Sequence, residues 1–150
     1  MIAELFASGR LALDAASSLR QGKVTYHDPC YFDCYNSVYD APRNVLHVLP
    51  ATDLTEMPRS RNHSFCCGGG GRAMMKEQSG TRINQDRVRE ALNSGAEVVA
   101  AACPFCMDML EDGIGSLDAA SKLRVLDLAE LVAGSLEAST SRSGNGRAVS

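Results

Sequence analysis

The chain has 150 residues, and its 15 Lys and Arg against 18 Asp and Glu give a formal net charge of −3. That length allows one domain with a hydrophobic core, and 45% hydrophobic with 22% charged residues is typical of a globular protein. A small negative charge without a basic stripe argues against nucleic-acid binding, which requires positive side chains against phosphates.

The N-terminal part predicts two helices and a strand. Residues 2–9 place apolar side chains on one side of a short helix, and residues 11–20, rich in Ala and Leu, predict a second helix. Residues 24–27 are β-branched or aromatic and predict a strand. We expect this strand to stop at Asp28-Pro29, because proline disfavours the helical conformation in the residue before it.

The next segment predicts a helix and a strand before a polar loop. Asp40 is expected to be the N-cap of the helix, Pro42 lies in its first turn, and Pro50 ends it. Residues 53–57 alternate between polar and apolar side chains and predict a strand. Residues 58–64 form a loop rich in Arg, Asn and Ser.

The C-terminal half predicts helices at 72–79 and 83–95, with Gly95 as the residue that follows the second helix. The continuous apolar run 96–102 is typical of a parallel strand covered on both faces. Pro104 begins another helix, whose inward side chains are expected to be Phe105, Met109 and Leu110. Residues 124–126 predict the last strand, Asp127 caps the last helix, and residues 138–150 predict a disordered tail.

Alternating strands and helices predict an α/β fold with a small, mostly parallel sheet of about four strands flanked by helices. We expect one domain over residues 1–137. In such sheets ligands bind at the carboxyl ends of the strands. Cys30 and Cys103 directly follow predicted strands, and Cys66-Cys67 follow a short extended segment, so we expect these thiols to meet at one edge.

Five of the six cysteines form a spaced pattern, with thirty-five residues between Cys30 and Cys66 and thirty-five between Cys67 and Cys103, which Cys106 follows.

The N-terminus lacks the pattern of a signal peptide, and the longest apolar run is far shorter than the roughly 20 residues of a membrane-spanning helix. We therefore expect the chain in the reducing cytoplasm. There, several cysteines indicate metal or redox chemistry rather than structural disulfides.

Thiolates bind iron–sulfur clusters, zinc or cuprous copper. A tetrahedral zinc site uses four ligands, so five thiols, or six with Cys34 one helical turn after Cys30, favour a cluster. Gly68 and Gly69 would let the backbone approach a cluster closely and donate N–H groups to sulfide. The alternative is that the cysteines are small core residues. Residues 68–73 also fit the letters of a dinucleotide fingerprint, but they directly follow two cysteines and no long strand.

Some other side chains have two interpretations. His27 is expected to cap the turn at Asp28-Pro29, and contact with a cluster is the alternative. Three arginines could offset the charge of a thiolate-rich cluster or lie on a solvated surface. They are Arg43, Arg72 and Arg82. His47 and His63 are expected at the surface, and the sequence assigns no catalytic residue.

Cys30, Cys66-Cys67-Gly68 and Cys103-x-x-Cys106 resemble the cysteine-rich CCG domain of a heterodisulfide reductase subunit and its relatives. Residues 26–31 (YHDPCY) and 102–110 (ACPFCMDML) are most similar to the bacterial iron–sulfur oxidoreductase branch. The resemblance covers residues 1–137 and implies that the five cysteines hold a 4Fe-4S cluster, non-cubane in this family, or zinc as in some members. Two features depart from the family pattern: Cys34 replaces an arginine, and the glycine run is one residue shorter.

The resemblance also implies partners, because family members usually carry two such domains and this chain matches the C-terminal one. The expected partners are a second CCG domain and a ferredoxin-like or flavin-containing unit. Membrane attachment would come through a partner, at the inner face of the membrane. The favoured hypothesis is an iron–sulfur oxidoreductase domain that relays electrons, or reduces substrate at the cluster, within a larger dehydrogenase or reductase complex.

Two other hypotheses remain open. A zinc-stabilised binding module without redox activity would tolerate loss of one cysteine, because four ligands suffice. A thiol–disulfide oxidoreductase acting through Cys103 and Cys106 would need neither Cys30 nor the Cys66-Cys67 pair.

Overall fold

The computed structural model describes residues 2–11, 13, 22–70 and 80–140. Four strands form one sheet in the order β2-β1-β3-β4, and every neighbouring pair is parallel. The predicted α/β class and the small parallel sheet are therefore confirmed. The strands are β1 (Gly22–Tyr26), β2 (Thr52–Leu54), β3 (Val98–Ala101) and β4 (Arg124–Asp127).

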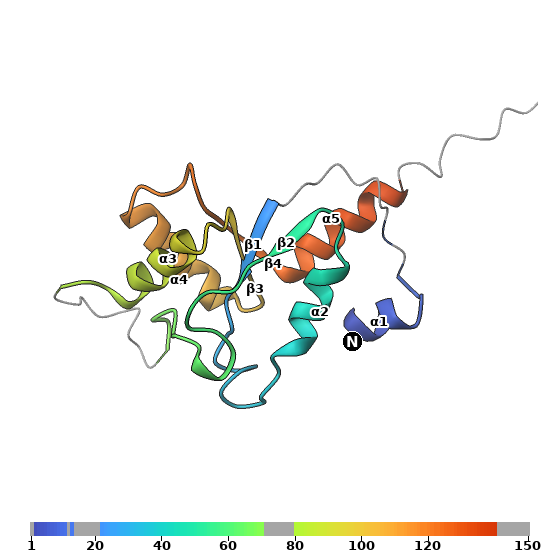
Figure 1. The fold of residues 1–150 in the computed structure, drawn as a ribbon, viewed down its shortest axis with the longest axis horizontal. Helices are drawn as coiled ribbons and strands as arrows, with labels where there is room; N and C mark the ends of the chain where they lie inside the picture. The colour runs from blue at the N-terminus through green and yellow to red at the C-terminus, as the bar shows by residue number, and fades with distance from the viewer. Residues whose placement is uncertain (1, 12, 14–21, 71–79, 141–150) are drawn as a thin grey trace, which may run out of the picture.

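The helices cover both faces of this sheet. Figure 1 shows α3 and α4 on one side of the strands and α2 and α5 on the other. Among the residues that the structure describes, no helix combines the length and the apolar character that crossing a bilayer demands. The helices are α1 (Ile2–Ala7), α2 (Asp40–Val48), the 3₁₀ helix η1 (Arg61–His63), α3 (Ile83–Asn93), α4 (Pro104–Ser116) and α5 (Leu128–Thr140).

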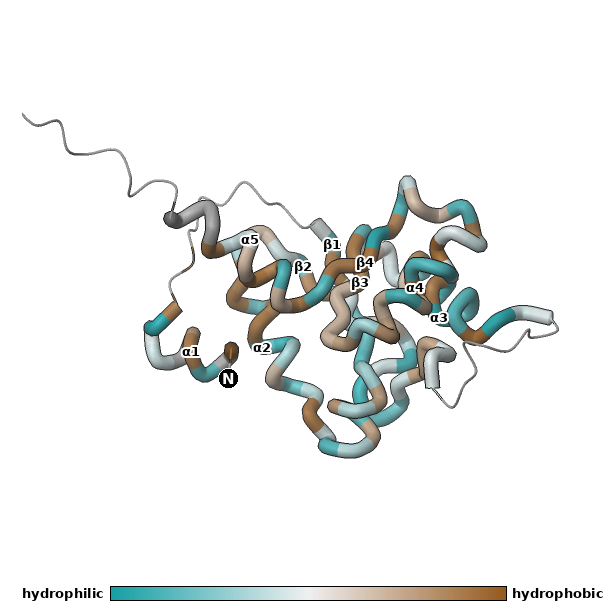
Figure 2. The backbone as a smooth tube through the Cα atoms, turned by 180° about the vertical axis from the view of Figure 1, so that it is seen from behind, coloured by the Kyte–Doolittle hydropathy of each residue, from teal (hydrophilic) through white to brown (hydrophobic). Residues whose placement is uncertain are grey.

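The central strand β3 is buried along its whole length and divides the core in two. Val98 and Ala100 pack in a cluster with side chains of α2 and α5. Val99 and Ala101 pack in a second cluster with side chains of α3 and α4. Figure 2 shows hydrophobic segments gathered at the strands and along α5. Alternate β3 side chains thus point to opposite faces, which explains why its sequence is a continuous apolar run rather than an alternating one.

The order of the strands creates a crevice between β1 and β3. After β1 the chain moves to β2 at one edge of the sheet, and after β3 it moves to β4 at the other edge. In open parallel sheets, the carboxyl ends of two strands whose connections diverge in this way form the usual ligand crevice. The backbone N–H of His27, just past the end of β1, donates to the carbonyl of Ala100 at 2.9 Å, which holds the two strand ends together.

The structure corrects some local expectations. Strand β2 covers Thr52–Leu54 rather than 53–57. Tyr39, and not Asp40, is the N-cap of α2, and it makes no side-chain capping bond. The Asp40 carboxylate instead accepts a hydrogen bond from Nη1 of Arg61 at 2.7 Å. An exposed ion pair with a distant loop has therefore replaced the predicted local cap.

Other expected elements agree with the structure or lie outside it. Gly95 follows the C-cap of α3 with a φ of 76°, as predicted, and the Asp127 side chain accepts the N–H of Ala129 at the start of α5. The helices expected at 11–20 and 72–79 fall largely outside the described residues. Helix α5 continues to Thr140, beyond the expected start of the tail at residue 138, and residues 141–150 are not described.

Helices α3 and α4 lie in close contact at Gly113. A Cβ atom at Gly113 would lie 3.0 Å from the backbone oxygen of Asn84 and 3.0 Å from Cγ2 of Val88, whereas one at Gly115 meets nothing within 4 Å. We expect Gly113→Ala to lower the free energy of unfolding by about 1–3 kcal/mol, the usual result of overpacking. Gly115→Ala is the control and should be neutral or slightly stabilising, because alanine favours helix. Urea titration measures both, and equal stabilities would contradict this close contact.

Candidate functional site

All six cysteines line one cavity of about 410 Å³. The cavity lies past the carboxyl ends of β1 and β3, at the predicted edge of the sheet. The loop after β1, the segment after η1 and the start of α4 each contribute two thiols. In that order the pairs are Cys30 and Cys34, Cys66 and Cys67, and Cys103 and Cys106.

The thiols differ in their exposure. Cys67 and Cys106 are 5% and 3% exposed, and their Sγ atoms lie 3.4 Å apart. Cys103 is half-buried, and Cys30, Cys34 and Cys66 are exposed. The cavity therefore has a buried pair of sulfur atoms and more accessible thiols around it.

A helical turn in the loop after β1 brings Cys30 and Cys34 to the same wall. The N–H of Asp33 donates to the carbonyl of Pro29 at 3.0 Å, and the N–H of Cys34 donates to the carbonyl of Cys30 at 2.9 Å. These bonds span four residues, so the two cysteines are one turn apart. Cys34, which the sequence left as a candidate sixth member, thus shares the cavity with the five cysteines of the pattern.

Asp28 joins the first cysteine segment to the second. Its carboxylate accepts two bonds from the Arg43 guanidinium, at 2.7 and 2.9 Å, and one from the backbone N–H of Arg61 at 2.9 Å. Its carbonyl accepts a bond from the Ser64 hydroxyl, two residues before Cys66. Burial alone would raise the pKa of Asp28, but the bonds from Arg43 and Arg61 hold that pKa below its ordinary value. A charged Asp28 therefore holds the Cys66-Cys67 segment close to Cys30.

The backbone after the cysteine pair points donors at sulfur. The N–H of Gly68 donates to Sγ of Cys66 at 3.2 Å. A hydrogen bond with Cys67 and burial raise the pKa of the Cys66 thiol, while the N–H groups of Gly68 and Gly70 lower it. The contact with Cys106 raises the pKa of Cys67 to about 11. Both thiols are thus protonated at neutral pH without metal, and binding a soft metal would release their protons.

Gly68 has a φ of 88°, which favours glycine, and a Cβ there would lie 3.3 Å from side chains of Ile83 and Met109. We expect Gly68→Ala to lower the free energy of unfolding of the metal-free chain by about 1–2 kcal/mol, because a residue with a Cβ is strained in this conformation. Gly70→Ala is the matched control, since a Cβ at Gly70 meets nothing within 4 Å. Thermal unfolding followed by circular dichroism measures the difference, and similar losses in both variants would refute it.

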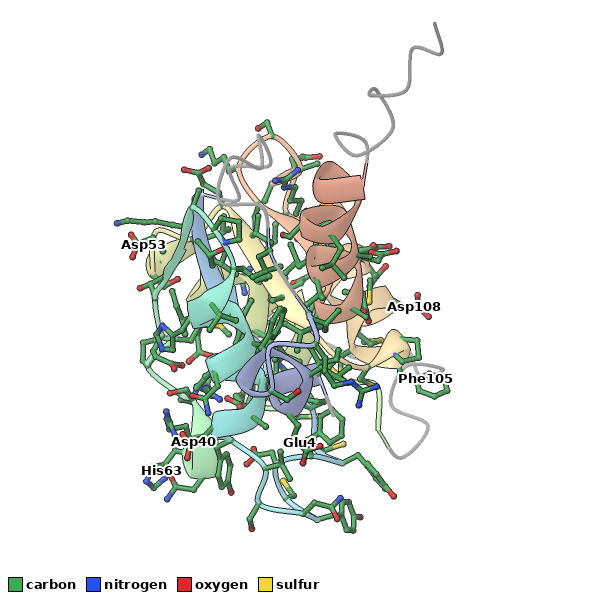
Figure 3. All side chains as sticks on the ribbon, turned by 90° about the vertical axis from the view of Figure 1, so that its right-hand side faces the viewer. Glu4, Asp40, Asp53, His63, Phe105 and Asp108 are labelled. Carbon is green, nitrogen blue, oxygen red and sulfur yellow. The ribbon has the colours of Figure 1, made fainter. Side chains whose placement is uncertain are left out.

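Two expectations at the site are wrong, those for His27 and Phe105, and one of the two interpretations of Arg43 is excluded. His27 does not cap the turn at Asp28-Pro29: its ring is buried, and Nδ1 accepts a hydrogen bond from Nε of Arg87 at 3.1 Å. Arg43 does not lie on a solvated surface, because Asp28 and Glu56 surround its buried guanidinium. Phe105 does not point inward, since it is 61% exposed at the cavity wall and projects away from the domain in Figure 3.

Sequence reasoning missed two residues that support the site, Arg87 and Asp28. Arg87 lies on the buried stripe of α3 with Asn84, Val88 and Ala91, so its helical position was a signal that it points inward. Besides Arg43, two arginines were expected to offset the charge of a cluster, and neither is described as buried beside the cavity. Arg82 pairs with Asp112 at the surface, and Arg72 lies outside the described residues.

The cavity suits a soft, bulky inorganic group. The donors are six thiols from three segments and the ring of His27, and the Gly68 N–H already donates to one of the sulfurs. Sulfur donors select iron–sulfur clusters, zinc or cuprous copper. A Cβ at Gly69 would lie 3.2 Å from Met109 and 3.5 Å from Sγ of Cys67, so glycine keeps the backbone close to the sulfur atoms. The thiols, the volume of the cavity and the backbone N–H donors together fit an iron–sulfur cluster.

The sequence profile of the CCG cysteine-rich domain matches residues 24–111, which include all six cysteines. Similar proteins include the probable iron-sulfur-binding oxidoreductase FadF of Bacillus subtilis (strain 168), 43% identical over 114 residues. A probable membrane-anchored ferredoxin of Chromohalobacter salexigens is 43% identical over 137 residues. One subunit of the dihydromethanophenazine:CoB–CoM heterodisulfide reductase of Methanosarcina barkeri (strain Fusaro) is 41% identical over 120 residues.

The matches cover most of this chain and a small part of each relative. They span 75, 91 and 79% of the chain but only 16, 20 and 29% of the three relatives in the same order. No solved structure is significantly similar to the chain.

Proposed function

Because the chain belongs to the CCG cysteine-rich domain family, we propose that it is a redox domain that binds a 4Fe-4S cluster. The proposed ligands are Cys30, Cys66, Cys67, Cys103 and Cys106. The domain would relay electrons, or take part in reduction of a substrate at the cluster, within a larger dehydrogenase or reductase complex. The names of its relatives, an iron-sulfur-binding oxidoreductase and a heterodisulfide reductase subunit among them, support an iron–sulfur redox role.

The meeting of all six cysteines at one cavity carries this proposal. Cysteines used as core filler would be distributed among the two apolar clusters of the domain. In the part of the chain that the structure describes, Cys67, Cys106 and Cys103 instead pack in a small separate cluster with Met109. A common cavity for thiols from three distant segments is the arrangement that a sulfur-ligated group requires.

The chain contributes ligands, donors and a scaffold. Cys67 and Cys106 would hold the group from the buried side, and Cys30, Cys66 and Cys103 from the more accessible side. The N–H groups of Gly68 and Gly69 would face its sulfur atoms. When bound, an iron–sulfur cluster supplies one-electron chemistry at a potential set by hydrogen bonds and exposure. Ion pairs of Arg43 with Asp28 and Glu56 keep the loops in position.

Exchange of electrons requires partners, which we propose to be a second CCG domain and a ferredoxin-like or flavin-containing unit. The chain spans a small share of its relatives' lengths, which supports a role beside such units. We propose a cytoplasmic location, because reduced thiols need a reducing compartment. The name of the membrane-anchored ferredoxin relative supports attachment to the inner face of the membrane through a partner. Residues 1–137 would form the domain, and the tail would begin after α5 ends at Thr140.

Anaerobic reconstitution of the chain with iron and sulfide tests the proposal. We expect a brown protein with the charge-transfer absorption of an iron–sulfur cluster and about four iron and four sulfide per chain, the content of a 4Fe-4S cluster. Purification with stoichiometric zinc, and no sulfide after reconstitution, would instead establish the zinc-stabilised module. Reversible oxidation in a metal-free variant lacking Cys30, Cys66 and Cys67 would establish the thiol–disulfide oxidoreductase.

A further inference from the structure

His27 lies beside the buried sulfur pair. It directly follows β1, is 1% exposed and lines the cavity. A ring nitrogen of His27 and the Sγ atoms of Cys67 and Cys106 all lie within 4.8 Å of one another. By distance alone, His27 could be a metal ligand together with these two cysteines.

A hydrogen bond from Arg87 determines which ring nitrogen of His27 carries the proton. It is fully buried, and its Nε donates to Nδ1 of His27 at 3.1 Å. A guanidinium has five donors and no acceptor, so Nδ1 must be the acceptor in this bond. A neutral imidazole that accepts at Nδ1 carries its proton on Nε2. Because Nδ1 accepts this bond, it carries no proton of its own, and the ring is the neutral imidazole.

Contacts on α3 and the loop before the cysteine pair fix Arg87. Its Nη1 donates to the Glu90 carboxylate at 2.7 Å and to the carbonyl of Arg59 at 2.8 Å. The Arg59 guanidinium in turn lies 3.5 Å from the centroid of the Phe65 ring, next to Cys66. Arg87 therefore cannot leave Nδ1 of His27 without breaking two other hydrogen bonds.

We propose that His27 donates a hydrogen bond from Nε2–H to sulfur at the bound cluster and is not a metal ligand, with Arg87 as the positioning residue that fixes this tautomer. This inference rests on the proposed function. In the described structure, the lone pair of Nδ1 is engaged by Arg87, and Nε2 has a proton where a ligand needs a lone pair. The sulfur atoms of Cys67 and Cys106 are the nearby acceptors, since both lie within 4.8 Å of a ring nitrogen of His27. Donation to a thiolate stabilises the more negative, reduced state and raises the reduction potential.

The tautomer can be measured without metal. Long-range ¹H–¹⁵N correlation spectra of the metal-free chain at pH 7 should show one histidine in the pure Nε2–H form, absent from His27→Gln. His47 and His63 are exposed and act as internal references for freely exchanging rings. In Arg87→Lys, which lacks the planar donor, the His27 signal should move toward a mixture of tautomers. A pure Nδ1–H form of His27 in the unsubstituted chain would overturn the proposal.

Reconstituted variants distinguish a donor from a ligand. His27→Gln keeps an amide donor and an acceptor for Arg87, and His27→Leu keeps neither. We expect both to retain the iron and sulfide content of the unsubstituted chain, and His27→Leu to have the more negative midpoint potential. Loss of iron from His27→Gln, with native circular dichroism of the metal-free protein, would show that His27 is a ligand. If the unsubstituted chain takes up no iron, the proposed function fails, while the tautomer measurement still tests the geometry.

Discussion

Replacement of Arg43 by methionine is expected to lower the free energy of unfolding of the metal-free chain by about 3–5 kcal/mol, because removing one partner leaves a buried charge without compensation. Arg43 is 2% exposed and donates to both carboxylate oxygens of Asp28 and, through Nε, to Glu56 at 2.6 Å. In the variant, the Asp28 carboxylate stays buried and keeps only the backbone N–H of Arg61. Urea unfolding measures the loss, a large part of the roughly 5–15 kcal/mol that stabilises most domains.

Four further variants, Asp28→Asn alone among them, test whether the loss comes from the buried Arg43–Asp28 pair rather than from removal of any positive charge. Arg61→Ala removes an exposed pair with Asp40 but keeps the backbone N–H, so it should cost about 1 kcal/mol or less. Arg43→Lys keeps the charge without the planar fork and should fall between these values. Asp28→Asn combined with Arg43→Met should cost less than the sum of the single changes, since the two residues touch. A loss below 1 kcal/mol in Arg43→Met would contradict the role given to this pair.

The fold could be predicted from local sequence patterns where burial of the side chains dictates those patterns. The apolar run before Cys103 predicted β3 because both faces of a central parallel strand are covered. Pro104 marked the start of a helix because proline restricts φ, and Gly95 marked the end of one because glycine adopts a positive φ without strain. Neither effect depends on a distant residue. The Asp40 carboxylate, expected to cap α2, instead accepts a hydrogen bond from Arg61, which is distant in sequence. A tertiary contact of this kind leaves no local signal.

The candidate site, too, has one part that the sequence predicted and one part that it did not. Spacing of the cysteines and their positions after strands predicted a shared edge, since the carboxyl ends of parallel strands lie together. The polar scaffold beneath the thiols was not predicted. Asp28 and Arg43 are fifteen residues apart, and Arg87 is sixty residues from His27. Single arginines and aspartates are usually exposed, so only the folded chain reveals which of them form buried pairs.

Alanine at any one of the five proposed ligand positions is expected to lower the iron bound after reconstitution by at least about 10- to 100-fold, because even partners outside the ligand set have effects of that size. Cys67→Ala and Cys106→Ala test this most sharply, since their sulfur atoms are buried 3.4 Å apart and water cannot easily replace them as a ligand. Iron and sulfide analysis with visible absorption measures the loss. The five positions are Cys30, Cys66, Cys67, Cys103 and Cys106.

Cys34→Ala is the matched control, because Cys34 lines the same cavity but lies outside the set of five. We expect it to keep the iron and sulfide content of the unsubstituted chain. Circular dichroism of the metal-free forms should show that all six variants are folded. If Cys34→Ala loses iron while one of the five variants retains it, Cys34 belongs to the ligand set and the assignment by family pattern is wrong. If one of the five variants retains the full metal content and the metal is zinc, four thiols suffice, and the tetrahedral site replaces the cluster.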